Sequence, residues 1–346
     1  MRTALTALPT IRQHLSVSLD ATELQLMFYL REGLATFMRH VFTQRGTEYQ
    51  SKTFARALIF VLLLWAATLL GPSLQAQESP YIVTYDHYLE EPGSLEVEYF
   101  STFGTQRGGN DFHAFWAEFE YGATAWWTTE VYLDGQTTFN DSTIFTGFRW
   151  ENRFRILQRE HFINPVLYIE YEQISGADKI LKEIEGHDIE ESNADPNSLA
   201  RQEHNHEIET KLLLSKTFNG WNIAENTIAT KNVTGGNPWE FGYAIGASRP
   251  LALKARAKRC SLCPENFVAG VELYGDLGDR HSFGLHETSH YLAPVIAWNL
   301  PSDWTLRLSS GFGLNDNSHR LLLRWGVSRE FSGFGSAMAR LFGARQ

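Results

Sequence analysis

The sequence lacks the features of several large protein classes. It has only two cysteines in 346 residues, too few for a four-thiolate zinc site. Its net charge of −10 does not suit a nucleic-acid-binding protein, which needs a basic surface. No apolar run reaches the roughly 20 residues that a membrane-spanning helix requires. We therefore expect neither a nucleic-acid binder nor a helical membrane protein.

The longest apolar run, Ala57 to Leu70, has the organisation of a secretory signal peptide. Lys52 and Arg56 precede it, a Gly-Pro pair follows it, and Ala76 offers a small residue before cleavage at Gln77. A short buried core helix is the alternative. The basic flank and the abrupt change to an aromatic-rich alternating pattern favour the signal peptide.

The position of this signal predicts the organisation of the N-terminal region. A signal peptide normally lies at the N-terminus of a chain. Here residues 1–50 precede the predicted signal over residues 51–76. We expect residues 1–50 to be a non-structural N-terminal extension, with the true start nearer Met38 or Val41. N-terminal sequencing of the membrane-inserted protein tests this expectation.

Both cysteines lie in the segment Cys260-Ser261-Leu262-Cys263. A redox-active pair needs a thioredoxin-like βαβ setting, which the pattern does not indicate, and haem attachment needs a histidine where Pro264 stands. In an oxidising compartment, we expect Cys260 and Cys263 to form a disulfide.

After Gln77 the dominant hydrophobic period is two, which is typical of β-strands. Twelve segments follow this period, most of them about 9 to 13 residues long, as tilted membrane strands are. An even number of strands is also usual in single-chain bacterial barrels. We predict the strands Leu95–Phe103, Phe112–Tyr121, Trp126–Asp134, Thr143–Arg155, Ile163–Gln173, His204–Thr217, Trp221–Lys231, Trp239–Arg249, Phe267–Asp276, Tyr291–Asn299, Trp304–Gly313 and Arg320–Phe331.

The alternation separates apolar residues from charged ones. In the first segment Leu95, Val97 and Tyr99 share one face, whereas Glu96 and Glu98 share the other. A soluble sandwich or lipid-binding barrel buries the apolar face; a membrane barrel turns it to lipid and points the charges into its lumen. We predict an all-β protein, a transmembrane antiparallel up-and-down β-barrel of about 12 strands after an N-terminal signal peptide.

Connection lengths favour the membrane barrel. If the first strand runs outward, most periplasmic links are short and the outer loops are longer, as expected for outer-membrane barrels. The longest loop, Ile174–Glu203, is acidic and polar, with little apolar content to fold on. We assign residues 77–94 to a periplasmic N-terminal segment, residues 95–331 to the barrel and residues 332–346 to a C-terminal tail.

From Gln77 to Phe331 the chain resembles Gram-negative outer-membrane β-barrel proteins. The resemblance rests on the signal peptide, the twelve alternating strands and the closing Ser328-Arg329-Glu330-Phe331. In that group, a terminal aromatic strand is read by the barrel-assembly machinery; here residues 332–346 follow it. The segment His290-Tyr291-Leu292-Ala293-Pro294 and the Leu-rich last strand are similar to uncharacterised transporter-like barrels grouped with phenol-degradation pathways.

Charges on the inward face are the candidate functional residues. Acidic strands are flanked by basic ones, which suggests a polarised pore that selects solutes by charge. The alternative is a salt-bridge network that seals the lumen, because twelve strands lie between filled and open barrels in size. The predicted lumen charges are Glu96, Glu98, Glu118, Glu120, Glu130, Asp134, Arg149, Glu151, Arg153, Arg155, Glu170, Glu172, Arg307, Arg320 and Arg324.

Several histidines fall at the predicted outer end of the barrel. Neutral imidazole is a common ligand of zinc, copper and nickel, so His204, His206, His286 and His290 are candidate ligands of an external metal site. Polar loop residues without a metal are the alternative, and the one we favour.

The sequence indicates no enzyme and no cofactor. The neighbouring pairs His281/Ser282 and Ser289/His290 do not make a catalytic triad, which needs a third group that orients the histidine. We expect a channel or transporter for an unknown small solute, or alternatively a structural or adhesive surface barrel. The expected partners are outer-membrane lipid, lipopolysaccharide and the barrel-assembly machinery, and no nucleic acid.

Overall fold

The structure is a computed structural model, and it describes residues 79–106, 109–180, 195–254 and 260–342. By its internal contacts, the chain divides into Met1–Ala66 and Ala67–Gln346, and all described residues belong to the second unit. The predicted extension over residues 1–50 and the signal peptide over residues 51–76 lie outside the described residues.

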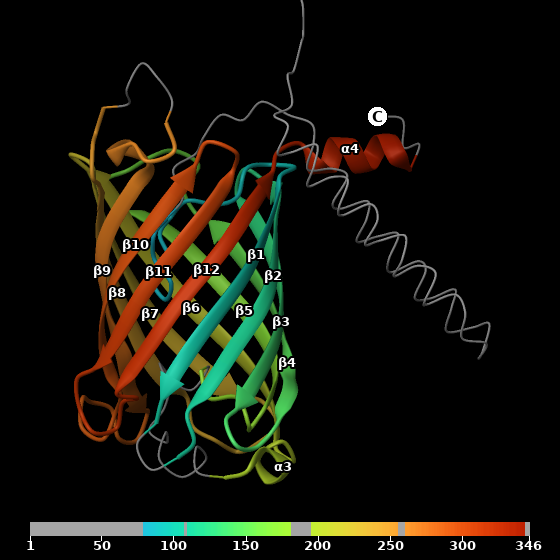
Figure 1. The fold of residues 1–346 in the computed structure, drawn as a ribbon, viewed down its shortest axis with the longest axis vertical. Coiled ribbons are helices and arrows are strands. Elements are labelled where there is room, and N and C mark those ends of the chain that lie inside the picture. Colours follow the sequence, from blue (N-terminus) through green and yellow to red (C-terminus); the bar gives the residue numbers. More distant parts are fainter. Residues whose placement is uncertain (1–78, 107–108, 181–194, 255–259, 343–346) are drawn as a thin grey trace, which may run out of the picture. The chain divides into compact units, whose positions relative to one another are not determined.

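Twelve antiparallel strands form one closed barrel in which each strand pairs with its neighbours in the chain, and β1 pairs with β12 (Figure 1). The fold predicted from the two-residue period is thereby confirmed. The strands are β1 Leu95–Thr105, β2 Phe112–Thr124, β3 Trp127–Thr138, β4 Thr143–Arg155, β5 Asn164–Ser175, β6 His204–Phe218, β7 Trp221–Asn232, β8 Glu240–Pro250, β9 Phe267–Asp279, β10 His290–Leu300, β11 Trp304–Gly313 and β12 Leu321–Phe331.

The two faces of the barrel wall have opposite character. Phe145 and Trp150 point outward and are 66% and 51% exposed, whereas the inward Glu130 and Glu151 are 1% and 0% exposed. A soluble protein buries its apolar side chains and leaves its charges in water. The reversed arrangement suits a closed barrel in lipid, where all backbone hydrogen bonds are made between strands.

The β2–β3 and β6–β7 connections are only two residues long, and the other connections are longer. Asn219 and Gly220 link β6 to β7 with positive φ angles of 50° and 79°, the backbone of a tight hairpin turn whose twist matches the strands. The short helix α3 (Asn197–Ala200) lies in the β5–β6 loop, and a 3-10 helix (Pro264–Asn266) precedes β9. No helix in the described parts of the chain is long and apolar enough to cross a membrane.

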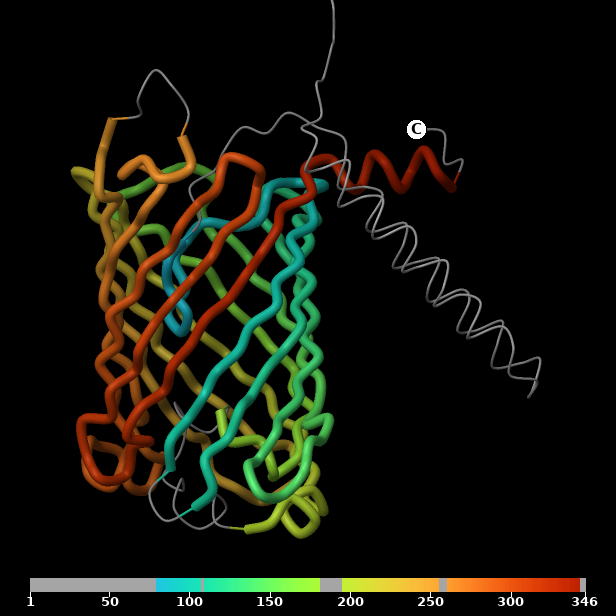
Figure 2. The backbone as a smooth tube through the Cα atoms, viewed as in Figure 1, coloured from blue at the N-terminus to red at the C-terminus, as the bar shows by residue number. Residues whose placement is uncertain are grey.

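The N-terminal segment was assigned to the periplasm, but residues 79–94 run inside the barrel (Figure 2). Tyr81, Val83 and His87 are buried there, and the segment bonds to inward side chains of the wall. The chain leaves the lumen at the barrel end that also holds the start of α4 (Phe334–Leu341), where the Gly335 amide donates to the Gly93 carbonyl. We call this the terminal end and the other the loop end.

Candidate functional site

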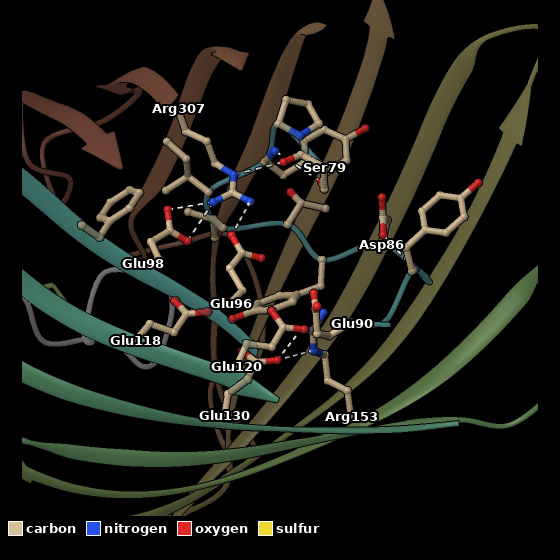
Figure 3. A pocket seen from close by; sticks show the side chains of 18 of the residues that line it. Ser79, Asp86, Glu90, Glu96, Glu98, Glu118, Glu120, Glu130, Arg153 and Arg307 are labelled. Atoms are coloured by element: carbon tan, nitrogen blue, oxygen red, sulfur yellow. Dashed lines mark hydrogen bonds and ion pairs between the residues drawn. The ribbon is translucent and has the colours of Figure 1, made fainter. Parts of the chain in front are cut away.

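A cavity of about 890 Å³ lies in the lumen between the wall and the N-terminal segment. Its lining extends from Glu330, near the terminal end, to Asp178 of the β5–β6 loop, and it includes residues 79–86. Figure 3 shows carboxylates of β1, β2 and β3 turned into this space, with Arg307 and Arg153 on two sides of them. The cavity is the candidate functional site.

Glu272 of β9 holds the N-terminal segment in place. Its carboxylate, which is fully buried, accepts hydrogen bonds from the amides of Ile82 at 3.2 Å, Val83 at 2.9 Å and Thr84 at 2.7 Å. Backbone amides converging on one carboxylate make strong, charge-assisted hydrogen bonds. This role could not be predicted from the sequence, because a single glutamate in a strand looks like any other inward charge.

Two residues of β7 hold the same segment from a second side. Asn226 accepts from the Tyr85 amide at 2.7 Å and donates to the Tyr85 carbonyl at 2.8 Å. The Tyr81 hydroxyl donates to the Asn222 carbonyl at 3.0 Å. Next to it, Gly246 leaves room for the Tyr81 ring, since a Cβ atom at this glycine would lie 2.6 Å from the ring. The small residue is what allows the segment to approach the wall.

His87 provides a further polar anchor for the segment. Its ring contacts the Ser215 hydroxyl through Nδ1 at 2.5 Å and the Glu160 carboxylate through Nε2 at 2.6 Å. Burial alone would raise the pKa of Glu160, but hydrogen bonds from His87 and Lys216 outweigh it and lower this pKa. Histidine and serine are both buried, and neither lines the cavity. The trio is therefore an anchor and not an accessible nucleophile.

One row of glutamates crosses seven neighbouring strands at a single register level. Each member lies directly opposite the next on the same inward face, where side chains are only about 5 Å apart at Cβ. We call it the glutamate row. Its members, on β12 and β1 to β6 in order, are Glu330, Glu96, Glu120, Glu130, Glu151, Glu170 and Glu209.

Arginines neutralise the middle of the row. Arg153 contacts Glu130, Glu120 at 2.5 Å and Glu151 at 3.1 Å. Arg149 pairs with Asp134 at 3.0 Å and reaches Glu170 at 3.4 Å. Buried ion pairs of this kind hold their geometry because leaving one partner unpaired is costly.

Two more cations act at the edges of the row. Arg307 pairs with Glu98 at 2.7 Å, and its guanidinium also lies 3.8 Å from Glu96. Lys211 pairs with Glu209 at 2.7 Å and lies over the Tyr168 ring at 4.3 Å, a cation–π contact. The pairs partly offset the negative charge of the lumen.

Other carboxylates of the lumen have no counter-ion. Glu118 of β2 lies directly opposite Glu98, and Glu172 of β5 lies beside the glutamate row. Within the described residues, neither Glu118 nor Glu172 has a hydrogen bond or an ion pair. The wall of the cavity therefore carries more negative than positive charge on the β1–β6 side.

At the loop end, residues 176–180, which begin the β5–β6 loop, turn into the barrel. These residues are buried, and Ile180 packs in one apolar cluster with Val83 of the N-terminal segment and Phe112 of β2. His319, before β12, lies 3.3 Å from the Lys179 carbonyl. Burial lowers the pKa of His319 to about 4, so this ring is neutral where it packs.

Several solved structures are similar to this chain at low sequence identity. A crystal structure of an outer membrane channel from Pseudomonas putida F1 is similar at 10% identity, covering 70% of this chain and 97% of that one with a TM-score of 0.43. The KdgM porin gives 8% identity, 68% and 98% coverage, and a TM-score of 0.40. LpxR from Salmonella typhimurium is 9% identical; the match covers 68% of this chain and 99% of that one, with a TM-score of 0.35. No family model and no curated protein matches the sequence.

The fold is that of an outer-membrane-type β-barrel. A closed ring of twelve antiparallel strands, with apolar side chains outside and charges inside, is its defining feature. The outer surface suits a lipid bilayer, because Leu133, Leu292 and Trp325 are exposed on it.

Most predicted lumen charges face the interior of this barrel. Arg324 is buried and donates to the Tyr274 hydroxyl at 3.2 Å, and the half-buried Arg155 donates to the His87 carbonyl at 3.2 Å. Arg320 differs, since it lies one residue before β12 and is exposed. Glu209 and Lys211 were not among the predicted lumen charges, although strict alternation along β6 places both on the inward face.

The four candidate metal-binding histidines do not come together. His206 contacts the Tyr171 hydroxyl at 2.6 Å on β5, and His290 contacts Tyr243 at 3.2 Å on β8. His204 and His286 are exposed. Among residues 79–342, as far as described, the groups with three ligand atoms close together contain glutamates and no histidine.

The two cysteines lie outside the strands, in the β8–β9 connection. Cys260 and Cys263 are joined by a disulfide, with their Cα atoms 5.5 Å apart. The Ser261 carbonyl between them accepts a hydrogen bond from the Trp298 ring at 2.8 Å. The small loop is thereby held against β10, away from the cavity.

Proposed function

We propose that this barrel is a channel for small solutes that prefers cations. The observation that carries the proposal is the glutamate row on seven neighbouring strands, of which every member except Glu151 lines the cavity. A wall with excess negative charge in a low-dielectric enclosure raises the local concentration of cations and repels anions. The preferred solutes are small and positively charged.

Aromatic rings of the lumen support the same preference. Arg149 lies over the Tyr132 ring with 4.0 Å between guanidinium carbon and ring centre, and Lys211 lies 5.0 Å from the Tyr85 ring centre. Rings that accept protein cations on their faces also accept cationic solutes. Carboxylates and aromatic faces around one cavity thus form a surface for organic as well as inorganic cations.

A planar-bilayer recording under a potassium chloride gradient tests the proposal. We expect discrete conductance steps with a reversal potential of the sign that cation preference gives. Replacing Glu98 and Glu118 by glutamine together reduces the preference, because both carboxylates line the cavity. The matched control is Glu225→Gln: Glu225 lies between the inward Ala224 and Asn226 of β7, so its side chain points away from the lumen. Anion preference of the unmodified barrel would contradict the proposal.

A second candidate function is a sealed structural or adhesive surface barrel. The packing of Ile180 against Val83 inside the lumen favours it, because the two segments enter the barrel and meet in one apolar cluster. The same recording separates the two candidates. A silent bilayer, with a protein that still shows the heat-dependent gel shift of a closed barrel, supports the sealed barrel.

A further inference from the structure

A second group of carboxylates lies next to the arginine-filled centre of the lumen. Glu170 and Glu172 of β5 and Glu209 of β6 each offer an oxygen atom, and these atoms all lie within 4.8 Å of one another. All three residues are at least 95% buried, and all three line the cavity, so ions in the lumen can reach them. Three carboxylates at this spacing repel one another unless a cation lies between them.

The protein places its cations differently here than in the comparable group Glu118, Glu120 and Glu130. In that group Arg153 contacts both Glu120 and Glu130, so a guanidinium already bridges two carboxylates. In the β5–β6 group, Arg149 contacts Glu170, and Lys211 contacts Glu209. Among the described residues, no single cation forms ion pairs with two of these three carboxylates, so none joins them as Arg153 joins Glu120 and Glu130.

Glu172 is the member that most needs a partner. It is 4% exposed and, within the described part of the chain, it makes neither a hydrogen bond nor an ion pair. A buried carboxylate without a counter-charge is strongly unfavourable, and metal coordination is one of the ways in which proteins compensate it.

An independent observation comes from β7. Thr230 lies directly opposite Glu209 on the inward face, so its side chain is next to that carboxylate. The residue is 2% exposed, and its hydroxyl has no hydrogen-bond partner among the described residues. Buried hydroxyls are usually satisfied, and an unsatisfied one next to Glu209 offers a neutral oxygen ligand to an ion bound there.

We propose that Glu170, Glu172, Glu209 and Thr230 form a divalent-cation site in the lumen wall, with calcium as the ion that fits best. The ligands are all oxygen atoms, which hard cations prefer, and none is a thiolate or imidazole of the kind that selects zinc or copper. Calcium tolerates irregular coordination, and water in the adjoining cavity completes its shell. Magnesium is less suited because it demands near-ideal octahedral geometry.

Terbium luminescence on the full-length protein, folded in detergent, tests this site. Terbium replaces calcium at oxygen sites, and the Tyr168 hydroxyl contacts Glu170, so the ring is close enough to sensitise the ion. We expect saturable luminescence that calcium abolishes by competition. Glu172→Gln weakens terbium and calcium affinity by about tenfold or more, because it removes one of the charged ligands that set calcium affinity. Thr230→Val weakens it by about threefold, since only a neutral ligand is lost.

The matched control is Glu118→Gln, which neutralises the other unpaired carboxylate of the lumen and leaves the proposed site intact. We expect its terbium affinity to equal that of the unmodified protein. Absence of saturable luminescence, or equal weakening by Glu118→Gln and Glu172→Gln in barrels that both keep their heat-dependent gel shift, overturns the site. Binding does not require conduction, so a silent bilayer with intact terbium binding contradicts the channel and leaves the site standing.

Discussion

The two sides of the lumen differ in the side chains that they carry and in their contacts with the N-terminal segment. The side formed by β1 to β6 carries the glutamate row and its arginines, whereas β7 to β10 present mostly small or neutral side chains, such as Ala224, Asn226, Ala244, Ala293 and Ala297. We call them the acidic side and the neutral side. The N-terminal segment bonds mainly to the neutral side and leaves the acidic side facing the cavity.

The neutral side therefore holds the N-terminal segment in the lumen, while the acidic side gives the lumen its negative charge. Small residues on the neutral side allow close approach, and Glu272 there serves the backbone of the segment instead of a solute. On the acidic side, carboxylates lie directly opposite one another on neighbouring strands, and like charges in such positions lower the stability of the barrel. A costly arrangement of this kind is typical of a functional surface.

Removing Glu272 has the largest expected effect on this division. Glu272→Ala leaves the amides of Ile82, Val83 and Thr84 without their acceptor, and each lost bond costs about 1–3 kcal/mol when the donor stays buried. We expect the segment to leave the wall, so that a Thr84→Cys reporter in the folded barrel reacts with a maleimide much faster. The control is Glu118→Ala on the acidic side, which has no bond to the segment; equal reactivity in both variants would contradict the comparison.

Acidification should weaken the loop end of the lumen. His319 has a folded pKa of about 4, below its unfolded value of 6.5, so the packed state binds its proton less readily. Stability from this contact is complete above pH 6.5 and is lost as the pH falls toward 4, by about 3 kcal/mol in all. Hydrogen exchange of residues 176–180 measures it. A His319→Gln variant should lack the pH step, and an equal step in that variant would exclude His319 as its cause.

A methyl group on the neutral side tests how closely the segment is packed. Gly246→Ala places Cβ 2.6 Å from the Tyr81 ring, which two bonds to Asn222 hold in place. Overpacking of this kind costs about 1–3 kcal/mol, and we expect faster labelling at Thr84→Cys. Gly236→Ala, where nothing lies within 4 Å, is the matched control. Unchanged labelling in Gly246→Ala would show that the segment is held more loosely than its contacts indicate.

The smallest expected effect concerns repulsion on the acidic side. Glu118 lies directly opposite Glu98, and like charges in opposed strand positions are destabilising. Glu118→Gln should therefore stabilise the barrel by about 0.5–1 kcal/mol, measured as a higher urea midpoint of unfolding. A lower midpoint would mean that the carboxylate has a stabilising role in the lumen.

The strands could be predicted from the sequence because most inward and outward positions follow the two-residue period, which is broken only at β-bulges such as that at Gly135. The segment from Thr143 to Arg155 was placed with the bounds that the structure has, and Glu130 and Arg149 were placed on the inward face. Alternation along one strand needs no knowledge of its neighbours. The fold, and the placement of most charged residues on the lumen side of the wall, follow from that local signal.

Neither the register between strands nor the position of the N-terminal segment could be predicted from the sequence. That Glu151 lies opposite both Glu130 and Glu170 depends on the register between strands, which turn geometry and packing set. Residues 79–94 have no strand period, and their anchors, Asn226 and Glu272, are ordinary polar residues within strands. Only the folded chain brings such distant groups together.

The pair Glu96–Glu330 lies where the first and last strands join. Every other neighbouring pair in the glutamate row belongs to strands that follow one another in the chain and meet as a hairpin. These two carboxylates, by contrast, come from opposite ends of the sequence and meet only when the ring closes. Closure of the barrel therefore proceeds against electrostatic repulsion between these two carboxylates. Added salt screens charges that are still exposed to water before β1 and β12 pair, so it should accelerate the refolding of this protein.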